Sequence, residues 1–150
     1  MCSSDLQIRQ LIGGAEYLFS NEYEASLTEH KTGWTAEELI AQVGTRVTTL
    51  GADGVRVDRQ GESPIVVGPV KDVNPVDPTG TGDAFRAGFL AAVAWGLGLE
   101  RAAQLGNLVA VEVLETTGPQ EYALEPAELV ARCRTSYGDA AADDVAAHLS

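Results

Sequence analysis

Hydrophobic and polar positions change their period several times along the chain, and the changes predict short strands alternating with helices. A short apolar strand is expected at 17–20, after the end of a helix at 7–15. Helical spacing then predicts one helix to about residue 29 and a second from Thr35, where Glu38 completes a Thr-x-x-Glu capping box. This alternation is typical of an α/β layer fold rather than a helix bundle or a β-sandwich.

β-rich segments occupy the middle of the chain. Strands are predicted at 46–50, 55–58 and 65–67, and the glycine-containing turns between them predict an antiparallel piece. A polar, proline-containing loop follows at 71–78.

The remaining residues have helical patterns. Apolar residues recur on one face from Asp83 to Leu97, until Gly96 and Gly98 interrupt the pattern. The later elements are expected to be a helix at 100–115, a loop at 116–122, a final helix opened by Pro126, and an acidic, alanine-rich tail at 138–150.

Composition and charge narrow the classes of partner. The chain has 150 residues, one-domain length, and no apolar run near the ~20 residues that a membrane span requires. Its net charge of −12 would oppose binding to nucleic acid, whereas a small phosphorylated ligand can be held by backbone N–H groups alone. Cys2 and Cys133 are far apart and have no metal-ligand spacing, which indicates a reduced, cytoplasmic protein without a zinc site.

The most informative segment is Asp77–Phe85, a small-residue loop that runs into an amphipathic helix. Small residues allow a ligand to approach the backbone, and the N–H groups of Thr81, Gly82 and Asp83 are expected to form an anion hole. The segment is not a Walker loop, because no lysine follows a glycine. It also fails the dinucleotide fingerprint, which needs a small residue where Phe85 stands.

Asp83 is the candidate general base. A carboxylate beside an anion hole repels the phosphate that the hole attracts, so its presence is explained if it takes a proton from an attacking hydroxyl. The alternative is that Asp83 caps its helix.

Four motifs in order resemble the PfkB, or ribokinase-like, family of carbohydrate and nucleoside kinases. They are the C-terminal signature Asp77–Phe85, the Asn-x-x-Glu motif at Asn21–Glu24, the nucleotide loop at Thr49–Val55, and Asn107. The resemblance implies a Rossmann-like, three-layer α/β/α fold of the ribokinase type, of which the chain is a C-terminal portion with an antiparallel β piece.

The resemblance also implies roles for individual residues, with ATP and Mg²⁺ as cofactors. Asp83 would be the base, and the backbone of Gly80, Thr81, Gly82 and Asp83 would form the anion hole. Glu24 would organise Mg²⁺ through water, because this hard cation keeps several of its waters, and Asn21 would lie near the phosphates. The residues that would line the nucleotide are Thr49, Gly51, Gly54 and Asn107, the last beside the adenine.

Plainer interpretations of the same residues stay open. Glu22 and Glu24 also suit a solvated helix start, and Gly51 and Gly54 suit a hairpin turn.

Many relatives also hold a monovalent cation such as K⁺. The positions that correspond to that site are Asp77, Thr79, Val113 and Gly118.

Family chains are roughly twice this long, and their N-terminal half supplies most contacts to the acceptor and a lid that often dimerises. Residues 7–137 are therefore expected to be the ATP-binding, C-terminal part of a truncated kinase whose full-length parent is a homodimer, followed by the tail at 138–150. Residues 1–6 are similar to a translated adapter oligonucleotide, and we predict that they are a cloning or sequencing artefact. The alternative is an ordinary frayed N-terminus.

The amino-acid sequence of the motifs is most similar to that of bacterial adenosine kinases of this family. The expected reaction is transfer of the γ-phosphate of ATP to a primary hydroxyl of adenosine or a related nucleoside or sugar, with ribose and fructose as alternatives. The isolated chain is expected to have no turnover, because it lacks the lid half. The rival functions are a nucleotide-binding module without turnover and a Rossmann-like oligomerisation domain whose glycines serve only turns.

Overall fold

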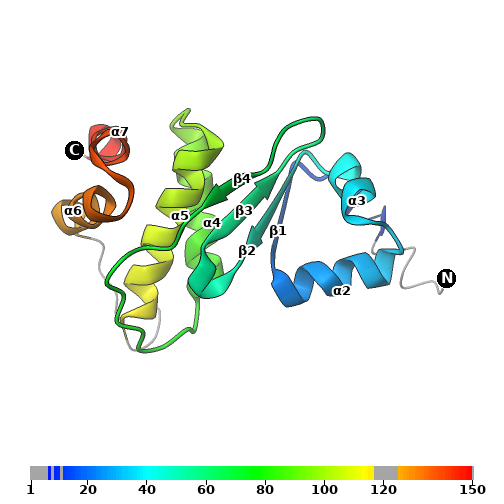
Figure 1. Cartoon of the computed structure of the whole chain (residues 1–150), viewed down its shortest axis with the longest axis horizontal. Coiled ribbons are helices and arrows are strands. Elements are labelled where there is room, and N and C mark those ends of the chain that lie inside the picture. Colours follow the sequence, from blue (N-terminus) through cyan, green and yellow to red (C-terminus); the bar gives the residue numbers. More distant parts are fainter. Residues whose placement is uncertain (1–6, 8, 11, 117–124, 150) are drawn as a thin grey trace. The chain divides into compact units, whose positions relative to one another are not determined.

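The computed structural model describes residues 7, 9–10, 12–116 and 125–149 (Figure 1). It contains two compact units, residues 1–66 and 67–150, and each has buried apolar side chains of its own. The adapter-like residues 1–6 lie outside the described residues.

The first unit carries most of a mixed sheet. Its strands are β1 (Tyr17–Asn21), β2 (Thr45–Thr49), β3 (Val55–Asp58) and β4 (Ile65–Val67), in the order β1-β2-β3-β4. β1 pairs with β2 in parallel, and β2 pairs with β3 in antiparallel orientation. The antiparallel piece predicted from the alternating pattern is thereby confirmed for β2 and β3.

The two faces of the β2–β3 pair differ in polarity. Val47 and Val57 are register partners, and both are buried, as is Val55 on the same face. Arg46 and Thr48 alternate with Val47 and therefore lie on the opposite face. The period of two in the sequence thus decides which side chains enter the apolar core.

Two helices complete the first unit, α2 (Glu22–Thr32) and α3 (Ala36–Gln42). α2 ends at Gly33, whose φ of 72° is left-handed, and so extends three residues beyond the predicted end. α3 has Thr35 as its N-cap, as predicted, with the Glu38 N–H donating to the Thr35 hydroxyl at 3.2 Å. The Glu38 carboxylate accepts a hydrogen bond from that same hydroxyl at 3.2 Å.

The second unit contains four helices within its described residues: α4 (Thr81–Ala94), α5 (Leu99–Leu114), α6 (Pro126–Tyr137) and α7 (Asp139–Leu149). α4 packs along α5, and α6 packs on both α5 and α7. α4 begins at Thr81, two residues before the predicted start, because Gly80 rather than Asp83 takes the N-cap position.

Glycines allow α4 and α5 to approach closely. A Cβ atom added to Gly88 would lie 2.9 Å from Leu105 O and 3.0 Å from Gly106 Cα. A Cβ atom added to Gly106 would lie 2.7 Å from the Phe85 ring. The missing side chains at these two positions therefore set the distance between the helices.

The interpretation of residues 138–150 as a tail that follows the final helix is wrong. Residues 139–149 form α7, and Ala141, Ala142 and Val145 are buried. The His148 ring stacks on the Trp95 ring with centroids 5.0 Å apart. Alanine is the best helix former, and these apolar residues recur at helical spacing, so the segment folds onto its neighbours despite its acidic composition.

No described helix combines the length and the apolar composition that a membrane-spanning segment needs.

Candidate active site

The loop that enters α4 is held by hydrogen bonds of its own. The Thr79 N–H donates to Asp77 Oδ1 at 2.9 Å, while the N–H and hydroxyl of Thr81 both donate to Pro78 O, at 3.2 and 2.9 Å. Gly80 is the N-cap of α4 with a φ of 83°, a conformation that favours glycine. The Thr81 N–H, which the sequence assigned to the anion hole, is thus used within the loop.

The N–H groups of Gly82 and Asp83 remain for a ligand. Neither has an acceptor among the residues that the structure describes. Both lie in the first turn of a 14-residue helix, where unpaired N–H groups and the helix dipole favour an anion.

Gly82 is not required by packing. A Cβ atom built on it would meet no atom of the described residues within 4 Å, and its φ lies outside the left-handed range. Glycine in a helix costs about 1 kcal/mol relative to alanine. The helix therefore loses stability by having glycine at position 82, although a side chain would fit there. This choice of residue suits a ligand that touches the Gly82 backbone.

Asp83 projects from the same turn into solvent. Its side chain is 85% exposed, and Oδ1 lies 2.8 Å from Arg86 Nη2, one turn further along α4. Asp83 does not cap the helix, because Gly80 is the N-cap and no side-chain cap hydrogen bond is present. The carboxylate is therefore accessible to a substrate hydroxyl.

Arg86 is a residue that sequence reasoning missed. Helical spacing contained the signal, since side chains three residues apart lie on the same face and an Asp–Arg pair at that spacing is favourable.

Asn21 and Glu24, in the first unit, form a capping box at the start of α2. The Glu24 N–H donates to Asn21 Oδ1 at 2.7 Å, and the Asn21 N–H donates to Glu24 Oε1 at 3.0 Å. Both residues and Glu22 are exposed. One carboxylate oxygen of Glu24 is thus used by the helix, which leaves the other for a hydrated cation.

Within the described residues, no three acidic, histidine or cysteine side chains gather into a group that could hold a metal ion by itself. Glu24 fits a contact made through water, which is the mode that Mg²⁺ favours when it keeps several of its waters.

The predicted nucleotide loop is a closed turn between β2 and β3. Its 3₁₀ turn (η1, Gly51–Asp53) is flanked by a 2.8 Å hydrogen bond from Leu50 N–H to Gly54 O. Gly51 and Gly54 both have positive φ, 59° and 99°. The turn requires these glycines, while Thr49 ends β2 opposite Val55.

Asn107 of α5 takes part in a polar cluster with two residues of the same unit. Its Nδ2 donates to Tyr137 Oη at 3.1 Å and to Gly68 O at 3.3 Å, and Tyr137 Oη donates to Gly68 O at 2.8 Å. Burial raises the pKa of Tyr137 to about 12. Tyr137 has no local sequence signal, because it is 30 residues from its partner.

The residues expected to hold a monovalent cation lie partly together. The N–H groups of Val76 and Asp77 donate to Leu114 O, at 2.8 and 2.9 Å, which brings this loop to the end of α5 beside Val113. The Val113 carbonyl already accepts from the N–H and hydroxyl of Thr116, at 3.1 and 3.0 Å. The role of Val113 as a cation ligand stays a prediction. Gly118 lies outside the described residues.

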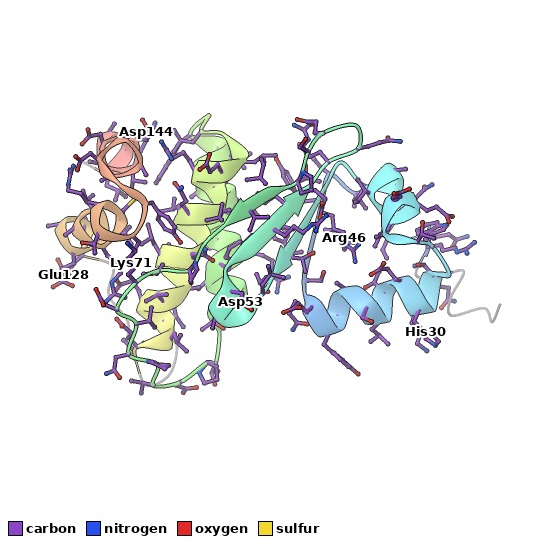
Figure 2. All side chains as sticks on the ribbon, viewed as in Figure 1. His30, Arg46, Asp53, Lys71, Glu128 and Asp144 are labelled. Carbon is purple, nitrogen blue, oxygen red and sulfur yellow. The ribbon has the colours of Figure 1, made fainter. Side chains whose placement is uncertain are left out.

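A cavity of about 320 Å³ in the first unit was not predicted. It is lined by residues of α2, α3, β2 and β3, including Arg46, whose guanidinium lies between β2 and α2 (Figure 2). Arg46 pairs with Glu29 at 3.2 Å, and Arg56 pairs with Asp58 at 3.0 Å. The two arginine side chains of this cavity are thus each paired with a carboxylate of the protein.

The sequence matches the pfkB family carbohydrate kinase domain over residues 2–126. The chain belongs to the pfkB family. It is 30% identical over 114 residues to a nucleoside kinase of Methanocaldococcus jannaschii, an alignment that covers 74% of this chain and 36% of that protein.

Solved structures of this family have the same fold. The nucleoside kinase of Burkholderia thailandensis in complex with inosine superposes with a TM-score of 0.85 at 33% identity, over 90% of this chain and 45% of that one. The adenosine kinase of Sinorhizobium meliloti gives a TM-score of 0.70 at 29% identity, over 87% of this chain and 40% of that one. These similarities confirm the predicted ribokinase-like α/β fold. The pfkB-family chain spans less than half the length of these relatives.

Proposed function

We propose that this chain is the ATP-binding portion of a nucleoside kinase. The observation that carries the proposal is the first turn of α4. Two N–H groups there, which have no acceptor among the described residues, adjoin the open backbone of Gly82 and the exposed carboxylate of Asp83. An anion site next to a proton acceptor is what transfer of a phosphoryl group to a hydroxyl requires. The similarity to a nucleoside kinase with bound inosine favours a nucleoside as acceptor, with adenosine as our first candidate.

In the proposed reaction, the oxygen of a primary hydroxyl forms a bond to the γ-phosphorus of ATP. The bond from that phosphorus to the bridging oxygen breaks, so that ADP leaves, and the proton of the hydroxyl goes to Asp83. The Gly82 and Asp83 N–H groups stabilise negative charge on the transferring group. Bound Mg²⁺, near Asn21 and Glu24, would neutralise phosphate charge.

Binding of MgATP to the 150-residue chain, measured by calorimetry, tests the site directly. Gly82→Ala should weaken MgATP binding at least about tenfold, because the new methyl group blocks the ligand's approach to the backbone. The fold should be at least as stable, because alanine has a higher helix propensity than glycine. Gly98→Ala is the control: Gly98 is the N-cap of α5, and a Cβ atom there meets no atom of the described residues within 4 Å. Equal affinities of the two variants would contradict the proposed site.

Turnover by the isolated chain separates the enzyme from a nucleotide-binding module. We expect the chain to bind ATP without phosphorylating adenosine, because it spans 45% of the Burkholderia kinase. Formation of AMP from adenosine by the purified chain would refute this expectation, and failure to bind ATP would favour a purely structural role.

A further inference from the structure

The polar cluster of Asn107, Tyr137 and Gly68 determines which way the Asn107 amide faces. The Gly68 carbonyl can only accept hydrogen bonds, and it accepts one from Tyr137 Oη at 2.8 Å. The hydroxyl hydrogen of Tyr137 is thereby used, so that the hydroxyl can offer Asn107 only a lone pair. Both neighbours of the amide are therefore acceptors.

An amide between two acceptors must direct its NH2 group toward them. Asn107 does so, with Nδ2 3.1 Å from Tyr137 Oη and 3.3 Å from Gly68 O. The opposite orientation would place Oδ1 against these oxygens and lose both hydrogen bonds. Among the described residues Oδ1 has no partner, so it is the polar atom of this side chain that is left for a ligand.

We propose that Tyr137 is a positioning residue for nucleotide selection: with the Gly68 carbonyl it fixes the Asn107 amide so that Oδ1 accepts a hydrogen bond from the exocyclic amino group of adenine. This inference rests on the proposed function and on the family resemblance, which implies that Asn107 lies beside the adenine. An acceptor at this place favours adenine, whose 6-position is an amino donor, over hypoxanthine, whose 6-position is a carbonyl.

The Tyr137 hydroxyl keeps its hydrogen at neutral pH, and burial raises its pKa further, to about 12. Tyr137 is the last residue of α6 and lies beyond the matched family domain, which ends at residue 126. The contact is thus supplied by an element that the family motifs do not predict.

The test compares the affinities of ATP and inosine triphosphate, which differ at this position of the base. Calorimetry on the unmodified chain should give about three- to tenfold tighter binding of ATP, the range of one net hydrogen bond. Tyr137→Phe should reduce the ratio to below about twofold, because the amide loses its closer partner and can rotate. Thr135→Val is the matched control, since it removes a hydroxyl of α6 whose one hydrogen bond among the described residues goes to Ala131 O.

The possible outcomes separate the two proposals. Absence of ATP binding by the unmodified chain would refute the proposed function, and the selectivity with it. ATP binding with no preference over inosine triphosphate, or a preference that Tyr137→Phe leaves unchanged, would overturn the inference alone. Loss of the preference in Tyr137→Phe but not in Thr135→Val would support it, since a merely destabilising change would not alter the ratio.

A measurement without ligand tests the orientation itself. The side-chain amide protons of Asn107, observed by NMR, should exchange with water several-fold more slowly in the unmodified chain than in Tyr137→Phe. Equal exchange rates would show that Tyr137 does not hold the amide.

Discussion

Asn21 and Glu24 form a reciprocal capping box at the first turn of α2: the Glu24 N–H donates to Asn21 Oδ1 at 2.7 Å, and the Asn21 N–H donates to Glu24 Oε1 at 3.0 Å. The same two residues are those that the family resemblance assigns to phosphate and Mg²⁺. A structural role and a proposed catalytic role therefore coincide, and substitutions can separate them.

Glu24→Gln keeps an oxygen that can accept from the Asn21 N–H but removes the charge. If Glu24 acts on hydrated Mg²⁺, this variant should lose at least about tenfold in kcat of a complete kinase that contains the chain, while its Tm stays within a few degrees. Glu24→Ala should lower both, since it also removes the cap. Equal kcat values for Glu24→Gln and the unmodified enzyme would leave Glu24 with the capping role alone.

Asp83→Asn tests the general base. In a complete kinase we expect kcat to fall about 10²–10⁴-fold, because the amide cannot take the hydroxyl proton, with a smaller change in the Kd for ATP. Steady-state kinetics and calorimetry measure the two quantities. The ion pair with Arg86 is exposed, so its loss should change stability by less than about 1 kcal/mol. Near-normal turnover of Asp83→Asn would exclude the assigned role.

Gly88→Ala and Gly106→Ala test the contact between α4 and α5. The added methyl group would lie 2.9 Å from Leu105 O in the first variant and 2.7 Å from the Phe85 ring in the second. We expect each to lower the free energy of unfolding by about 1–3 kcal/mol, measured by denaturant titration. Gly82→Ala, with open space around the new Cβ, serves as the control. No destabilisation of Gly88→Ala would mean that the helices can separate at little cost.

Val145→Asp tests whether residues 139–149 belong to the folded unit. Val145 is 1% exposed, and a buried carboxylate without a partner is costly. The variant should lose several kcal/mol of stability, whereas Asp143→Asn, at an exposed carboxylate on the same helix, should lose less than about 1 kcal/mol. Thermal unfolding distinguishes them, and equal Tm values would indicate that the segment does not pack.

Glu112 predicts a pH dependence of stability. Burial raises the pKa of Glu112 above its ordinary value, with Arg132 opposing the shift. The folded state therefore binds this proton more tightly than the unfolded state, so its contribution is fully present below the unfolded pKa and is lost as pH rises through the folded pKa. Glu112→Gln should remove this loss, which makes the variant less sensitive to pH between about 4.5 and neutrality. Parallel stability-versus-pH curves would contradict the prediction.

Much of the fold and of the candidate site could be predicted from the sequence. The strands β2 and β3, the turn at Gly51–Gly54 and the loop before α4 were all predicted, because their signals are local: a period of two, glycines between strands and a run of small residues. The predicted start of α4 at Asp83 was wrong by two residues, because Gly80 has the backbone conformation of the N-cap and the helix begins at Thr81.

The sequence by itself determined the order of the elements, the polarity of each strand face and the residue types around the first turn of α4, since these depend on neighbours along the chain. Tertiary structure decided which N–H groups stay unpaired, how closely α4 approaches α5, that residues 139–149 pack as a helix, and that Tyr137 holds the Asn107 amide. The physical reason is that hydrogen bonds and close contacts between distant residues leave no periodic pattern in either segment, and become visible only when the chain has folded.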